Sequence, residues 1–275
     1  MKPMVGLWCY CYLIFCSHQF VQACSVFPYY ACCSATATFL NQSYASYFET
    51  TMGTTGGKKI TSPKSLKILC FGDSLTAGYT SYGREHYPYA DSLRKDLEYM
   101  LSSSNIKVEV AGLSGDQVQG QYLQRIQEKC PTDKGRLYDW ILIMGGTNDL
   151  GWGQTPEVIY EGLKKVWDVA LNTGANVLAL NVPEGAASSP SMIEKRNMLN
   201  AMIKNHEQDR FYTFDLYSKI PYATLDKAER DRLWDDGLHL TGEGYKMMGD
   251  VIAVRLFEIL QEQTNAKKRA STTSD

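Results

Sequence analysis

The chain has 275 residues, of which 44% are hydrophobic, and this suits one large globular domain or one domain with extensions. Its 28 basic and 30 acidic side chains give a formal net charge of −2. This balance argues against nucleic acid as a partner, because nucleic-acid binders carry a basic face. No apolar run reaches the roughly 20 residues of a membrane-spanning helix, so we expect no integral membrane association.

The first 60 residues differ in composition from the rest of the chain. Six of the eight cysteines lie before residue 34, and Lys2 is the only charged residue before Glu49. We therefore predict that residues 1–60 form a leader or a poorly ordered N-terminal extension outside the folded domain.

Three interpretations of this segment stay open. A secretory signal over 1–23 would combine Lys2, an apolar run and a small-residue cleavage site that ends at Ala23, and the protein would then be secreted. An organelle-targeting leader is disfavoured, because the segment contains no Arg. Translation that starts at Met52 would leave the extension out of the working protein and give a cytoplasmic protein.

From residue 66 onward, short apolar runs alternate with segments of helical periodicity. Leu93, Leu97 and Leu101 repeat at helical spacing, and Pro156 and Gly174 are typical of the beginning and the end of a helix. In chain order we predict strand 66–71, helix 89–101, strand 106–112, helix 117–130, strand 140–146, helix 156–174, strand 176–182, helix 191–206, strand 211–217 and helix 241–263.

Strands that alternate with helices pair in parallel through right-handed crossovers. We therefore predict an α/β fold, a three-layer α/β/α sandwich around a mainly parallel five-stranded sheet, with the very apolar strand 140–146 at its centre. The folded domain is predicted over 61–263, and the polar residues 264–275 are predicted to form a disordered tail. In such a sheet the functional site lies beyond the carboxyl ends of the strands.

Reactive or hydrogen-bonding groups stand at that edge. Ser74 follows the first strand on a Gly-Asp-Ser turn, where a helix N-terminus favours developing negative charge. Gly115 follows the second strand and lets a substrate approach a backbone N–H, and Asn148 follows the third with an amide that can donate to an oxyanion. Before the last helix, Asp236 and His239 have a spacing at which a carboxylate can fix the tautomer of an imidazole.

These four blocks, Gly72-Asp73-Ser74-Leu75, the loop with Gly115, the loop with Asn148, and Asp236-Gly237-Leu238-His239, resemble the SGNH, or GDSL, hydrolase superfamily of serine esterases and lipases. The resemblance spans about residues 66–262 and implies a flavodoxin-like sheet. It implies Ser74 as nucleophile, His239 as base and Asp236 as orienting acid. It also implies that the Ser74 N–H, the Gly115 N–H and the Asn148 side chain form the oxyanion hole.

The leading hypothesis is a cofactor-free serine hydrolase that cleaves carboxylic esters through an acyl-enzyme, with a small-molecule or lipid-like ester as its substrate. Esterase, lipase and lysophospholipase-like activities all fit this hypothesis. The alternatives are an acyltransferase or a carbohydrate deacetylase on the same triad, or a catalytically idle α/β binding module. The sequence contains no His, Cys and carboxylate cluster with the spacing of metal ligands, so no metal is expected.

Aromatic residues near the proposed site are candidates for the rim of a substrate pocket. The candidates are Tyr79, His86 and Trp152, with Tyr82, Tyr87 and Tyr89 on nearby loops.

Other polar residues are expected to have structural or solvated roles. Asp73 and Asp149 are expected to stabilise turns beside Ser74 and Asn148. Asp235 is expected to be solvated, and His206 is expected to lie at a solvated helix end.

Overall fold

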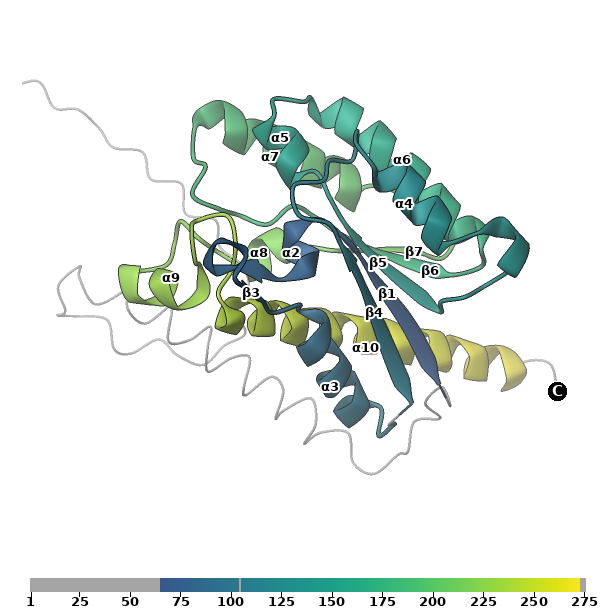
Figure 1. The fold of residues 1–275 in the computed structure, drawn as a ribbon. Coiled ribbons are helices and arrows are strands. Elements are labelled where there is room, and N and C mark those ends of the chain that lie inside the picture. Colours follow the sequence, from purple (N-terminus) through teal and green to yellow (C-terminus); the bar gives the residue numbers. More distant parts are fainter. Residues whose placement is uncertain (1–64, 104, 273–275) are drawn as a thin grey trace, which may run out of the picture. The chain divides into compact units, whose positions relative to one another are not determined.

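The computed structural model describes residues 65–103 and 105–272 (Figure 1). The predicted leader over 1–60, the alternative start at Met52 and the last three residues of the predicted tail lie outside these residues. Among the described residues, none of the helices combines the length and the apolar character that a membrane crossing requires.

The predicted parallel sheet is confirmed, and its five strands have the order β4-β1-β5-β6-β7. Every neighbouring pair in it is parallel. The apolar strand that was predicted to be central is β5, and it does occupy the middle position. The strands are β1 (Leu66–Gly72), β4 (Ile106–Gly112), β5 (Trp140–Met144), β6 (Asn176–Leu180) and β7 (Phe211–Phe214).

Helices cover both faces of this sheet, as the three-layer prediction required (Figure 1). One layer contains α3 (Ala90–Met100) and α10 (Gly242–Thr272), which pack against each other. The other contains α4 (Tyr122–Lys129), α6 (Pro156–Asn172) and α7 (Pro190–Lys204), in which α6 contacts both neighbours.

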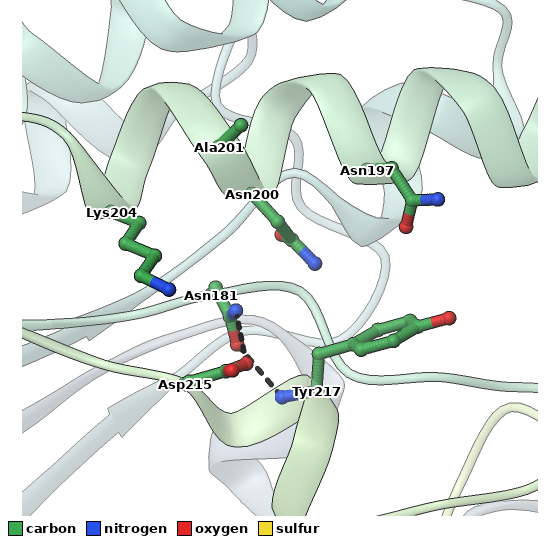
Figure 2. A pocket seen from close by; sticks show the side chains of 7 residues that line it. All are labelled: Asn181, Asn197, Asn200, Ala201, Lys204, Asp215 and Tyr217. Carbon is green, nitrogen blue, oxygen red and sulfur yellow. Dashed lines mark hydrogen bonds between the residues drawn. The ribbon is translucent and has the colours of Figure 1, made fainter. Parts of the chain in front are cut away.

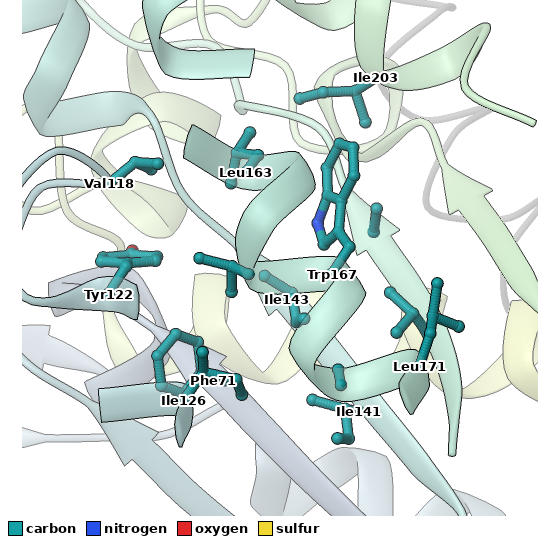
Figure 3. Packing of buried hydrophobic residues seen from close by; sticks show 14 of the residues in the cluster. Phe71, Val118, Tyr122, Ile126, Ile141, Ile143, Leu163, Trp167, Leu171 and Ile203 are labelled. Carbon is teal, nitrogen blue, oxygen red and sulfur yellow. The ribbon is translucent and has the colours of Figure 1, made fainter. Parts of the chain in front are cut away.

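A hydrophobic core cluster lies between the sheet and the layer of α4 and α6 (Figure 3). Phe71 and Ile143 come from β1 and β5, Tyr122 comes from α4, and Leu163 and Trp167 come from α6. All five side chains are 2% exposed or less. Because burial of each such side chain stabilises the fold by roughly 1.5–3 kcal/mol, this cluster anchors the carboxyl ends of β1 and β5.

Shorter elements were not predicted, and most of them connect the strands to the main helices. They are α2 (Ser74–Ala77), β2 (Tyr79–Thr80), η1 (Ser81–Gly83), β3 (Glu85–His86), η2 (Thr132–Lys134), α5 (Thr147–Gly151), α8 (Leu216–Lys219) and α9 (Lys227–Leu233). β2 and β3 pair antiparallel as a two-stranded sheet.

Most predicted elements differ from the observed bounds by one or two residues, and two differ by more because Asp side chains hold turns. The last strand ends at Phe214, not at residue 217, because Asp215 caps α8 by accepting from the Ser218 N–H at 3.3 Å. The helix predicted over 117–130 begins at Tyr122. Before it, the Asp116 carboxylate accepts from the N–H groups of Gln117 and Gln121 at 2.9 and 3.0 Å and holds the chain in turns.

The C-terminal helix α10 continues through most of the segment for which we expected a disordered tail. It extends to Thr272, whereas the predicted helix ended at residue 263. Residues 264–272 contain no Gly or Pro and are rich in Ala, Lys and Arg, which are good helix formers. The Gln263 side chain also donates to the Tyr212 hydroxyl at 2.8 Å, which ties this part of the helix to β7.

Candidate active site

Ser74 stands at the N-terminus of α2, directly beyond the carboxyl end of β1. Asp73 caps this helix, since its Oδ1 accepts from the Leu75 N–H at 3.0 Å. The turn is tight, because a Cβ on Gly72 would lie 2.2 Å from Thr76 Oγ1 and 2.8 Å from the Met144 carbonyl oxygen. Only 5% of Ser74 is exposed, so the core of the protein fixes the position of its hydroxyl group.

The structure brings Ser74, His239 and Asp236 into one chain of hydrogen bonds. The distance from Ser74 Oγ to His239 Nε2 is 2.9 Å, and the distance from His239 Nδ1 to Asp236 Oδ2 is 2.8 Å. A carboxylate beside Nδ1 favours the tautomer with its proton on that nitrogen. Nε2 is then an acceptor for the Ser74 hydroxyl, as a general base must be.

The second oxygen of Asp236 is held by the backbone. Asp236 Oδ1 accepts from the N–H groups of Leu238 and His239 at 2.9 and 2.7 Å. Partial burial acts to raise the pKa of Asp236, but the hydrogen bonds from the His239 side chain and from these two N–H groups outweigh it and leave the pKa lowered. The carboxylate therefore stays charged beside the imidazole at neutral pH.

The loop with Asp236 and His239 is closed at its base. Trp234 and Leu240 form an isolated antiparallel bridge, and the Asp235 N–H donates to the His239 carbonyl oxygen at 2.9 Å. The side chain of Asp235, which we expected to be solvated, accepts from the Ser81 N–H at 2.7 Å. Asp235 is exposed, as expected, and this bond also joins the loop to η1.

The loops that carry Gly115 and Asn148 are joined by a hydrogen bond. The Asn148 side chain donates from Nδ2 to the carbonyl oxygen of Asp116 at 2.8 Å, one residue beyond Gly115. Gly115 has a φ of 77°, and a Cβ placed there would meet nothing within 4 Å, so its backbone borders open space. The two candidate oxyanion donors therefore lie on loops that are fastened to each other.

Asp149 stabilises the same pair of loops, and its expected structural role is confirmed. Its carboxylate accepts from the Val118 and Gln119 N–H groups at 2.9 and 3.1 Å. Burial raises the pKa of Asp149, while these backbone hydrogen bonds act against the rise. Asp149 is completely buried, so it ties α5 to the loop after β4 without contacting solvent.

Sequence reasoning missed the role of Arg125. Its guanidinium forms an ion pair with Asp116 Oδ2 at 2.6 Å and donates to the carbonyl oxygens of Gly72 and Ala111 at 3.2 and 2.6 Å. It thus joins the carboxyl ends of β1 and β4 to the Gly115 loop. Asp116 was visible beside Gly115, but no local pattern marks an arginine nine residues later as its partner.

The three predicted rim residues lie in different surroundings. The Tyr79 ring lies 4.5 Å from the His239 ring between centroids, and the exposed His86 lies 5.9 Å from Tyr79. Trp152 directly follows α5 and is 77% exposed. Tyr89, which we also placed near the rim, is completely buried in the core, so that expectation was wrong.

His206 lies just beyond the end of α7, as expected, but its side chain is half-buried and not fully solvated. Its ring lies 5.0 Å from Trp167 and 4.5 Å from Phe211 between centroids, and its Nδ1 is 2.9 Å from the Tyr160 hydroxyl. This burial was not predicted because these aromatic partners come from α6 and β7, which no local pattern around residue 206 could reveal.

A separate polar pocket of about 260 Å³ lies beyond the carboxyl ends of β6 and β7 (Figure 2). Asn181 bridges its floor by donating to Asp215 at 2.8 Å and accepting from the Tyr217 N–H at 2.8 Å. Its lining includes neither Ser74 nor His239. Over the described ranges, no group of three or more His, Cys, Asp or Glu side chains is placed to hold a metal ion.

The chain has a parallel sheet between helices, with a buried serine, a histidine and a carboxylate aligned at the carboxyl edge of the sheet. This combination is typical of hydrolase-like α/β proteins whose site is centred on a serine. The profile of the GDSL-like lipase/acylhydrolase family matches residues 70–247, which is more than half of the chain. The chain belongs to this family, and it is therefore an acyl or ester hydrolase in general terms.

Individual relatives agree with this assignment. An arylesterase from Vibrio mimicus is 27% identical over 199 residues, which cover 72% of this chain and 92% of the relative. A lipase/acylhydrolase from Enterococcus faecalis has a similar structure, with a TM-score of 0.55, 23% identity, and coverage of 70% of this chain and 96% of that one. A Clostridium thermocellum family 3 carbohydrate esterase matches with a TM-score of 0.55 and 19% identity, over 73% of this chain and 100% of that one. At these identities, the likeness to the two structures shows the fold alone.

Proposed function

We propose that this protein is a serine hydrolase that cleaves carboxylic esters through an acyl-enzyme on Ser74. The observation that carries the proposal is the unbroken series of hydrogen bonds from Ser74 Oγ through the His239 ring to the Asp236 carboxylate, at 2.9 and 2.8 Å. In this proposal His239 is the general base and Asp236 orients it.

The proton transfers follow from this geometry. The Ser74 hydroxyl attacks the ester carbonyl carbon while its proton moves to His239 Nε2, and the imidazolium that forms is paired with the charged Asp236. The imidazolium then gives its proton to the leaving alcohol as the ester C–O bond breaks and the acyl group stays on Ser74. A water molecule, deprotonated by His239, attacks the acyl carbon and releases the acid.

Three donors are proposed to hold the oxyanion of the tetrahedral intermediates. They are the N–H groups of Ser74 and Gly115 and the side-chain amide of Asn148. An asparagine amide carries two N–H donors, so one of them can fix the side chain on the Asp116 carbonyl oxygen while the other reaches the oxyanion. Donors fixed in advance cost little reorganisation when negative charge develops.

Aryl esters are the first substrates to test, because the Vibrio mimicus relative is named an arylesterase. The test is hydrolysis of p-nitrophenyl acetate, butyrate and octanoate by the full chain. Replacement of Ser74 by Ala should lower kcat by about 10⁴- to 10⁶-fold, because it removes the nucleophile.

Covalent labelling provides the second readout. A fluorophosphonate probe should attach to Ser74 in the wild-type protein and should leave the Ser74→Ala protein unlabelled. Ser218→Ala serves as the matched control, since Ser218 lies on α8 and its hydroxyl donates to the Asp215 carbonyl oxygen at 3.1 Å. Equal esterase activity in the Ser74→Ala and wild-type proteins, with both folded, would contradict the proposal.

A further inference from the structure

Tyr79 contacts the proposed base directly. The Tyr79 and His239 rings have centroids 4.5 Å apart and planes inclined by 45°. This separation lies at the short end of the 4.5–7 Å range over which aromatic rings attract each other. Tyr79 is the first residue of β2 and follows Gly78, whose φ of 76° turns the chain back after α2. The chain therefore leads within a few residues from α2 to the ring that contacts the imidazole.

The Tyr79 ring is held in place from several sides. The Tyr79 carbonyl oxygen accepts from the hydroxyl of Tyr245, a completely buried residue of α10, at 2.8 Å. On the ring itself, a Cβ on Gly83 would lie 2.8 Å from Tyr79 Cε2, so only a glycine leaves room there. The His86 ring meets the Tyr79 ring at 5.9 Å with planes at 89°. These contacts keep the ring against His239.

The contact gains importance when His239 becomes charged. A cation within about 6 Å of an aromatic ring is attracted by the negative charge above and below the ring plane. The Asp236 carboxylate lies on His239 Nδ1, and Asp235 lies on the same loop, where it accepts from the Ser81 N–H. On the far side of Tyr79, the His86 ring contacts the Tyr79 ring and not His239 itself. Tyr79 thus supplies an aromatic contact to an imidazole whose ring nitrogens face Asp236 and Ser74.

We propose that Tyr79 is a positioning residue for the reaction: its ring holds the His239 imidazole between Ser74 and Asp236 and stabilises the imidazolium that forms when Ser74 attacks. The inference rests on the proposed function, because it assumes that His239 accepts the Ser74 proton. It assigns the energetic role to the aromatic ring of Tyr79 and none to its hydroxyl group.

The first experiment compares Tyr79→Phe with Tyr79→Leu in the full chain. The Phe variant should keep kcat within about 2-fold, whereas the Leu variant should lose about 2- to 30-fold in kcat with little change in KM, which is the range of cation–ring attractions. Tyr217→Leu is the matched control, because Tyr217 lines the separate polar pocket (Figure 2). Equal losses in the Phe and Leu variants, or no loss in the Leu variant, would overturn the proposal.

A second variant separates stabilisation of the imidazolium from packing of the ring. It also provides a test if the Leu variant does not fold. Trifluorophenylalanine at position 79 has nearly the shape of phenylalanine but a ring depleted of negative charge. Its kcat should fall between those of the Phe and Leu variants, because a merely structural ring would not respond to its electron density. A kcat equal to that of Tyr79→Phe would overturn the stabilising role.

Nuclear magnetic resonance tests the contact without any ester. In the Ser74→Ala protein, the carbon-bound protons of the His239 imidazole should be shifted by the ring current of Tyr79, and Tyr79→Leu should abolish that shift. Unchanged shifts would overturn the inference even if the wild-type protein cleaves esters. Esterase activity that survives Ser74→Ala would instead count against the proposed function, while the shifts still report whether Tyr79 holds the imidazole.

Discussion

The two halves of the candidate site are built in different ways. Ser74 lies on a turn whose neighbours are buried in the core, with Asp73 only 1% exposed. His239 and Asp236 lie on a surface loop, and 33% of the Asp236 side chain is exposed. The packing of β1 and α2 therefore positions Ser74, the proposed nucleophile, whereas hydrogen bonds within and beside the loop position His239, the proposed base. Apart from changes to Ser74 itself, changes at the turn over 72–75 (the nucleophile turn) should act mainly on folding. Changes in the loop over 235–239 (the base loop) should act mainly on activity.

The largest effect is expected from Asp236→Asn in the base loop. The asparagine can place its NH₂ group against His239 Nδ1, which would force the imidazole proton onto Nε2 and prevent Nε2 from accepting the Ser74 proton. We expect kcat to fall by about 10⁴-fold, with the melting temperature within a few degrees of wild type. Steady-state kinetics and thermal melts measure both quantities. Asp209→Asn, at a side chain that is 91% exposed, is the control and should leave kcat unchanged.

If Asp236→Asn instead unfolded the protein, the contrast between the two halves of the site would be wrong, because the base loop would then be needed for the stability of the fold. If kcat fell less than 10-fold, Asp236 would not be the acid that orients His239.

Gly72→Ala tests the nucleophile turn and should show the opposite pattern. The new methyl group would overlap Thr76 Oγ1 and approach the Met144 carbonyl oxygen. Overpacking of this kind lowers the free energy of unfolding by about 1–3 kcal/mol. Urea denaturation measures the loss. Gly151→Ala, where a Cβ would meet nothing within 4 Å, is the control. A Gly72→Ala protein as stable as the control would mean that the turn has more room than its contacts indicate.

At the same turn, we expect a smaller effect in the pH dependence of the free energy of unfolding. Burial raises the pKa of Asp73 to about 7, although its hydrogen bond from the Leu75 N–H acts against the rise. Between the ordinary aspartate range and pH 7, the folded protein therefore holds a proton that the unfolded chain has lost. This contribution is fully present below pH 4, about where an unfolded-state aspartate titrates, and is lost as the pH rises through 7.

Asp73→Asn removes this titration while it keeps an oxygen to cap α2. Urea denaturation at pH 5, 6, 7 and 8 should show wild-type stability falling, relative to Asp73→Asn, as the pH rises. The lowered pKa of Asp236 contributes in the opposite direction, because its stabilisation is present above the unfolded-state pKa and is lost as the pH falls, and both proteins share it. A constant difference between the two proteins over this range would show that Asp73 is already charged in the folded state.

The two halves of the site also differed in how far the sequence alone could describe them. Ser74 and Asn148 lie just beyond the carboxyl ends of the apolar strands β1 and β5. The two strands are parallel neighbours in the sheet, which brings both residues to one edge, so local patterns were sufficient. Asp236 and His239 were found because these two residues, which bond to each other, lie three positions apart in the sequence. In each case the relevant geometry is set by neighbours in the chain or by the sheet.

Contacts between distant segments could not be predicted in this way. The partners of Arg125 are the backbone carbonyls of Gly72 and Ala111 and the side chain of Asp116, and carbonyl groups leave no trace in a sequence. The bond between Asp235 and the Ser81 N–H is of the same kind. The helical segment beyond residue 263 was missed because its polar composition was taken as a sign of disorder, while helix propensity and the contact with Tyr212 favour a helix.

Asp235→Ala is expected to have the smallest effect and to test how the two halves are joined. The Asp235 carboxylate accepts from the N–H of Ser81, whose φ of 50° is followed by a φ of 56° at Tyr82, and neither residue is a glycine. Such conformations cost free energy and persist where neighbouring contacts hold them. Without this acceptor, η1 should relax, and kcat should fall about 3- to 10-fold while the free energy of unfolding falls by only about 1 kcal/mol.

Asp235→Asn is the matched variant, because its amide oxygen can still accept from Ser81, and it should retain most of the activity. Steady-state kinetics on p-nitrophenyl butyrate, with urea denaturation of both variants, measures the two effects. If Asp235→Ala lost activity and stability in proportion, the base loop would be stabilising the fold as a whole. If neither changed, η1 would hold its conformation alone, and the position of His239 would depend on the bonds within its own loop and on the Tyr79 ring.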